Sequence, residues 1–170
     1  MKRKELKQLI KTVLKEIIHH HHDDMDSPEG AEAMRSAARH NLDDFTKAYM
    51  VAALWSSMTN TNDQGGDPLD KNYELDDIED DTFHKMVEDC KDFQKKYGEL
   101  YERGGWSDEQ AGHDFWLTRN GHGSGFWDRG YGQPDEIKEI GKQLTKAAKS
   151  YGTFDLYLAG GALDGLIAGN

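Results

Sequence analysis

The chain has very little cysteine, and it has no long apolar run. Cys90 is the only cysteine among its 170 residues, so no disulfide bond can form within the chain. Cys90 falls on the apolar face of an expected helix, which predicts a core thiol rather than a nucleophile. The sequence contains no run of about 18 apolar residues and no secretory-signal pattern. We therefore predict no transmembrane segment and a cytoplasmic protein.

Basic residues are scarce beyond the first part of the chain. The net charge is −11, although residues 1–18 hold six Lys or Arg against two Glu. The remaining residues therefore carry a net charge of −15. Such an acidic body repels nucleic-acid phosphates, so we predict no direct binding of nucleic acid. Three interpretations stay open: contact with a basic protein surface, imitation of DNA to block a host factor, and simple solubility.

The N-terminal segment differs from the rest of the chain. Residues 2–18 are predicted to form a basic amphipathic helix, and four consecutive histidines follow at 19–22. We therefore divide the chain into a first region, 1–22, and a single acidic globular domain, 23–170. The helix can lie on an acidic membrane surface, dock in a groove, pack on the acidic body, or pair with a second copy to give a homo-oligomer. Its apolar stripe consists of Leu6, Leu9, Ile10, Val13, Leu14, Ile17 and Ile18.

Hydrophobic periodicity predicts a mainly helical α+β domain. The four Trp, seven Tyr and six Phe argue for a packed core and against disorder. Strands at 154–158 and 163–167 are expected to form a hairpin across Gly160 and Gly161, and a short extended piece is expected around Phe126. The domain should thus hold about five to six helices and a small antiparallel sheet near the C-terminus. Beyond residues 2–18, helices are expected at 28–39, 42–58, 83–101, 107–120 and 135–151.

The segment 111–132, AGHDFWLTRNGHGSGFWDRGYG, combines ionisable and aromatic side chains with six glycines. Ser107 opens its helix with a capping-box pattern, and Asn120-Gly121 is a natural left-handed stop. Glycine permits positive φ and close backbone approach, so this composition indicates a surface shaped for contact or for chemistry. We predict a binding site formed by His113, Asp114, Trp116, Arg119, Asn120, His122, Trp127, Asp128 and Arg129.

In this interpretation the side chains have separate tasks. Trp116 and Trp127 supply contact area, while Arg119 and Arg129 bind an anion or a carboxylate. Asn120 shapes the loop together with the glycines. The partner is a protein surface or a small anionic ligand. The segment matches neither a dinucleotide fingerprint nor a phosphate loop, so no cofactor is expected.

Two other interpretations of the motif stay open. In the first, the protein is a metal-dependent hydrolase with His113, His122 and Asp128 as ligands and Asp114 as the base. The sequence has neither H-E-x-x-H nor C-x-x-C to support such a site. In the second, the motif is a scaffold, with its large rings in the core and Asp128 paired with Arg129. His113 and Asp114 point about 100° apart on a helix, so we do not expect them to act as a pair.

The motif AGHDFWLTRNGHG-x-GFWDRG resembles the signature of a family of small, acidic, uncharacterised proteins encoded mostly by bacteriophages. The resemblance runs from Phe45 to Tyr157. It implies a phage origin, a role as an accessory factor in the cytoplasm of the infected host cell, and a host or phage protein as partner. It implies no activity, so our leading hypothesis is a non-enzymatic binding module. The resemblance also includes AYMVAALWSS at 48–57, LDKNYELDDI at 69–78, MVEDCKDF at 86–93 and LTKAAKSYGTFDLYL at 144–158.

Overall fold

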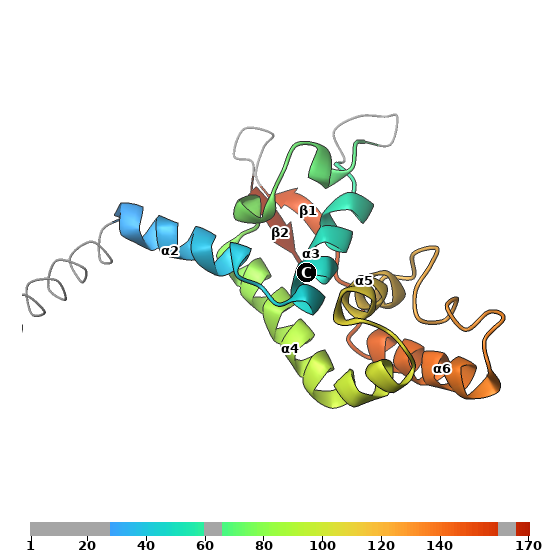
Figure 1. The fold of residues 1–170 in the computed structure, drawn as a ribbon. Helices are drawn as coiled ribbons and strands as arrows, with labels where there is room; N and C mark the ends of the chain where they lie inside the picture. The colour runs from blue at the N-terminus through green and yellow to red at the C-terminus, as the bar shows by residue number, and fades with distance from the viewer. Residues whose placement is uncertain (1–27, 60–65, 160–165) are drawn as a thin grey trace, which may run out of the picture. The chain divides into compact units, whose positions relative to one another are not determined.

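A computed structural model describes residues 28–59, 66–159 and 166–170 (Figure 1). The predicted helix at 2–18, the histidines at 19–22 and the turn at Gly160 and Gly161 lie outside these residues. The chain divides into two compact units, residues 1–41 and 42–170. In the first unit the described element is helix α2 (Pro28–His40), which matches the helix predicted there. The second unit carries the rest of the fold.

The described residues confirm a mainly helical α+β fold with a small antiparallel sheet at the C-terminal end. In the second unit α5 lies between α3 and α6, and α4 packs against α3 and α6 (Figure 1). Two 3-10 turns connect α3 to α4. The elements of this unit are α3 (Asp44–Ser56), η1 (Leu69–Lys71), η2 (Leu75–Asp77), α4 (Asp80–Arg103), α5 (Asp108–Arg119), α6 (Asp135–Lys149), β1 (Leu156–Ala159) and β2 (Leu166–Gly169).

Side-chain caps fix where α3 and α5 begin. The Asp43 carboxylate accepts a hydrogen bond from the Thr46 amide at 2.9 Å, and the Ser107 hydroxyl accepts one from the Gln110 amide at 3.1 Å. Each cap satisfies an amide that has no partner within its helix. At the other end of α5, Gly121 has φ +68°, the left-handed conformation expected for a residue after a helix. The predicted start of α5 at Ser107 and its left-handed stop at Gly121 are therefore confirmed. The capping box is only half formed, because the Gln110 side chain donates to Asp114.

The core is centred on the contact between α3 and α5. A Cβ atom at Gly112 would lie 2.0 Å from the carbonyl oxygen of Phe45, so the two backbones touch where Gly112 has no side chain. Around this point the rings of Phe93 and Phe115 stack with centroids 4.2 Å apart, and Tyr49 packs against Phe115 at 5.1 Å. Close backbone approach thus lets large rings from three helices meet in one cluster.

The C-terminal hairpin is confirmed, but its strands lie two to three residues further along than predicted. Leu156 pairs with Gly169 and Ala159 with Leu166. Burial decides this register, because Ile167 is fully buried and also bridges Ile78 in the second unit. The extended piece predicted around Phe126 is wrong. The chain makes consecutive turns there, since Phe126 is buried and donates its amide to the Thr118 hydroxyl at 3.0 Å.

Substitution of Gly112 by alanine should destabilise the protein by about 1–3 kcal/mol, because the new methyl group would overlap the Phe45 backbone. Gly98 in α4 is the matched control. A Cβ there would meet its nearest neighbour at 4.0 Å, so Gly98→Ala should stabilise the helix by about 0.5–1 kcal/mol. Urea unfolding of both variants gives the comparison. Equal effects would show that α3 and α5 do not touch at Gly112.

Candidate functional site

A fully buried carboxylate, that of Asp114, lies at the centre of the predicted site. Arg129 donates a hydrogen bond to each of its oxygens, from Nε to Oδ2 at 3.1 Å and from Nη2 to Oδ1 at 3.1 Å. Gln110 donates to Oδ1 at 2.9 Å, and the Trp106 indole donates to Oδ2 at 3.1 Å. Burying an ionised group is unfavourable unless it is paired and hydrogen-bonded. This set of donors supplies both conditions and joins α5 to the loop that carries Arg129.

His113 also contacts this carboxylate. Its Nδ1 lies 3.3 Å from Oδ1 of Asp114, so the expectation that the two residues would not pair is wrong. An offset of about 100° separates their Cβ atoms, but the imidazole is long enough to reach back to the adjacent carboxylate. An ionised carboxylate only accepts hydrogen bonds, so the neutral ring must carry its proton on Nδ1 and keep Nε2 as an acceptor. The Trp55 ring stacks beside it with centroids 6.0 Å apart.

Arg119 has a different surrounding from the one predicted. Its side chain is only 2% exposed, and Nη1 contacts Asp89 at 3.0 Å and the Tyr49 hydroxyl at 2.7 Å. The remaining nitrogens donate to backbone carbonyls, Nε to Gly152 at 2.9 Å and Nη2 to Tyr151 at 3.0 Å. A guanidinium that is enclosed in this way holds α3, α4, α5 and the end of α6 together. It offers no charge to an external anion.

Two further motif residues are part of the scaffold. Trp116 is 1% exposed, and its indole donates to the Ser56 hydroxyl at 2.7 Å. The contact area predicted for it is therefore inside the core. The Asn120 side chain donates to the Trp116 carbonyl at 3.2 Å and accepts from the Phe154 amide at 2.7 Å. Asn120 thus ties the end of α5 to the segment before β1.

The loop after α5 keeps part of the predicted surface. Trp127 is 54% exposed, and His122 and Asp128 are half-buried. The local ion pair between Asp128 and Arg129 does not form, because Arg129 pairs with Asp114 instead. Among the described residues no three His, Cys, Asp or Glu side chains come together to hold a metal ion. The alternative metal site at His113, His122 and Asp128 is therefore not assembled.

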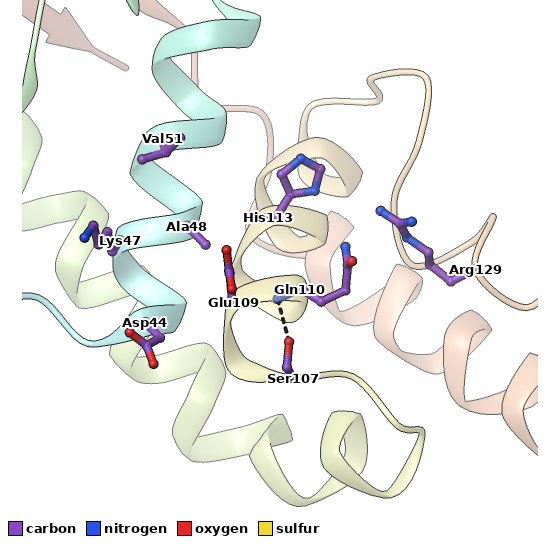
Figure 2. Close-up of a pocket in the computed structure, with 9 residues that line it drawn as sticks. All are labelled: Asp44, Lys47, Ala48, Val51, Ser107, Glu109, Gln110, His113 and Arg129. Carbon is purple, nitrogen blue, oxygen red and sulfur yellow. Dashed lines mark hydrogen bonds between the residues drawn. The ribbon is translucent and has the colours of Figure 1, made fainter.

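A pocket of about 550 Å³ opens beside this network, between α3 and α5 (Figure 2). Gln110 and His113 of α5 and Arg129 of the following loop are among the residues that line it. The sequence interpretation missed the α3 wall. The available signal is that apolar residues cover more than one face of this helix, a pattern that fits burial and an exposed apolar face equally well. The other residues that line the pocket are Asp44, Lys47, Ala48, Val51, Ser107 and Glu109.

Exposed apolar side chains continue from the pocket along α3. Val51 and Trp55 are 48% and 41% exposed, and their spacing of four residues places them on one side of α3. We call these two residues the α3 stripe. Val51 lines the pocket, and Trp55 stacks on His113, which also lines it. The stripe and the pocket therefore form one continuous surface.

Several titratable groups are buried away from this surface. Cys90 is fully buried, which confirms the predicted core thiol, and burial raises its pKa. Burial also raises the pKa of Tyr49, Tyr101 and Tyr151 above 10.0.

Of the helices in the described residues, none is both long enough and apolar enough to cross a lipid bilayer.

The two motif arginines should differ in their contribution to stability. Arg119→Met removes a buried guanidinium that contacts Asp89, the Tyr49 hydroxyl and two backbone carbonyls. Lys85 stays paired with Asp89, but the other partners lose their donor, and we expect a loss of about 3–5 kcal/mol. The Arg129 side chain is 40% exposed, and Asp114 keeps its other donors, so Arg129→Met should cost only about 1–2 kcal/mol. Urea unfolding at neutral pH measures both losses. A larger loss for Arg129→Met would contradict this assignment.

The free energy of unfolding should fall as the pH rises above about 10. The folded state keeps Tyr49, Tyr101 and Tyr151 protonated, because their pKa values are raised above 10.0. The unfolded chain releases these protons from about pH 10, so rising pH favours unfolding. Cys90 contributes in the same direction, because the unfolded chain releases its thiol proton from about pH 9 while the folded state retains it. Urea unfolding between pH 8 and pH 11 tests this, and Tyr151→Phe should flatten the dependence; an unchanged slope in that variant would refute the cause.

No family model, curated protein or solved structure matches this chain. Its function must therefore be argued from the site.

Proposed function

We propose that this protein is a non-enzymatic binding module whose partner surface consists of the α3 stripe and the adjoining pocket. One observation carries the proposal: large apolar side chains stand exposed at helical spacing on the rim of a pocket. The opposite side of α3 packs in the core through Phe45, Tyr49 and Met50. The helix is thus apolar on two sides, and a surface helix of a self-contained domain needs only one.

The chemistry of the stripe supports a protein partner. Aromatic residues and methionine are enriched at the centres of protein interfaces, where a few such side chains carry most of the binding energy. Trp55 is of this type, and its large exposed ring stacks on the His113 ring. A contiguous apolar patch beside a polar pocket is a common form of docking site.

The walls of the pocket are rigid, which supports binding without rearrangement. Gly112 fixes the distance between α3 and α5, and Asp114 holds Gln110, His113 and Arg129 in place through hydrogen bonds. Side chains that are ordered before binding lose little entropy when a partner arrives.

Binding is favoured over catalysis by the state of the polar groups in the pocket. The Ser107 hydroxyl accepts the hydrogen bond that caps α5, so it already serves the helix. Within the described residues no metal-ligand trio faces the pocket. The resemblance of the central motif to phage-encoded proteins supports a host or phage protein as the partner, in the cytoplasm of an infected cell.

Disruption of the stripe should abolish partner capture without unfolding the protein. We expect Trp55→Ala to lower the amount of a specific captured protein by at least tenfold, since loss of an interface tryptophan costs about 2 kcal/mol or more. Affinity capture from host lysate with quantitative mass spectrometry compares this variant with the unaltered chain. Val51→Asp should have the same effect.

Tyr157→Ala is the matched control, because Tyr157 is 42% exposed on β1 and does not line the pocket. The control should retain the proteins that the Trp55 and Val51 variants lose. Melting temperatures establish that each variant is folded. If the variants of the stripe and the control capture the same proteins in the same amounts, the α3 stripe is not the partner surface.

A further inference from the structure

We infer that the pocket between α3 and α5 receives an arginine side chain, so that the partner segment is basic. This inference rests on the proposed binding function, and it specifies the chemistry of the partner. It follows from the charges that remain available at the pocket after the internal ion pairs are formed.

Each of the two motif arginines is paired with a carboxylate of the protein. Arg119 is paired with Asp89 in the core, and Arg129 is paired with the buried carboxylate of Asp114. Their positive charge was the basis for expecting an anionic ligand. Once both guanidinium groups are matched, Lys47 is the one remaining cation among the residues that line the pocket. An anion would therefore find little positive charge there.

Two carboxylates of the pocket remain available. Asp44 and Glu109 line it from α3 and from α5, and no described Lys or Arg forms an ion pair with either of them. Figure 2 shows Glu109 directed between the two helices, with Asp44 at the foot of α3 and His113 one turn further along α5. The two carboxylates thus give the pocket negative charge from both helices.

The remaining walls fit a planar cation better than a compact one. In its neutral form the His113 ring presents Nε2 as an acceptor, because Nδ1 faces the Asp114 carboxylate. The half-exposed Trp55 ring is not among the lining residues, but it stacks on His113 and so places an aromatic side chain next to the pocket. A guanidinium can stack on an aromatic face and donate several hydrogen bonds in its own plane, whereas an ammonium is a strongly hydrated point charge. Arginine is therefore the better match.

The net charge of residues 42–170 also favours a basic partner. Residues 42–170 contain 25 Asp or Glu and 13 Lys or Arg, a net charge of −12. Such a field attracts a basic segment over distance and repels a second copy of the same acidic unit. Charge complementarity thus selects a basic partner with apolar side chains for the α3 stripe, rather than a homodimer through this face.

The test uses the full chain and a small probe, Nα-acetyl-L-arginine amide. Its matched control is Nα-acetyl-L-citrulline amide, which has nearly the same shape and no charge. We expect the arginine probe to shift the NMR signal of the Trp55 indole N–H saturably, with an affinity at least tenfold higher than that of citrulline. Nα-acetyl-L-glutamate amide should bind more weakly than either. Equal binding of the arginine and citrulline probes would overturn the inference, as would preference for glutamate.

Variants locate the binding. Glu109→Gln should weaken the arginine probe by about fivefold or more, and Asp44→Asn should act in the same way. Glu99→Gln is the control, because Glu99 is exposed on α4, lies outside the pocket and changes the net charge equally. If Glu99→Gln weakens the probe as much as Glu109→Gln, the attraction comes from the overall charge, and the inference fails.

The two proposals fail separately. Capture that depends on Trp55 together with no preference for the arginine probe would keep the binding surface and remove the basic partner. Binding of arginine at the pocket together with capture that is indifferent to Trp55 would remove the proposed function and keep the chemistry of the pocket.

Discussion

The buried carboxylate of Asp114 is the constraint on which the candidate site depends. A charge in the core must be matched, and here a glutamine and an indole at the start of α5 and an arginine from the loop after it donate to the carboxylate. Because Arg129 belongs to the loop after α5, the same pairing that neutralises Asp114 also attaches that loop to the helix. The carboxylate also contacts His113. One buried group therefore positions the polar side chains that line the pocket.

Much of the fold could be predicted because it follows from local patterns. Ser107 and Gly121 marked the ends of α5, and the periodicity of apolar residues located the other helices of the described residues. The hairpin was predicted, but its register depends on contacts of Ile167 with a segment about ninety residues earlier in the chain. Local preference alone cannot determine such a register.

The site was predicted less well, and the reason is the distance in sequence between charged partners. The motif was correctly found to be dense in polar groups, yet Arg119 pairs with a residue 30 positions away and Arg129 with one 15 positions away. No spacing rule links such residues. Exposed arginines and paired buried arginines therefore look the same in the sequence. Trp116 and Trp127 show the same ambiguity, since one is buried and the other is exposed.

This ambiguity changes what the motif implies about function. A segment rich in glycine, rings and charges resembles a ligand platform, but Gly112 serves close helix packing and Arg119 serves a buried ion pair. The features that suit a partner lie largely on α3, which the motif helps to position. Internal pairing also reverses the charge expected for the pocket. Because both motif arginines form ion pairs within the protein, the carboxylates of the pocket are the charges that a partner would contact. The recognition that we propose for this protein therefore depends on which charged side chains are already paired within the fold.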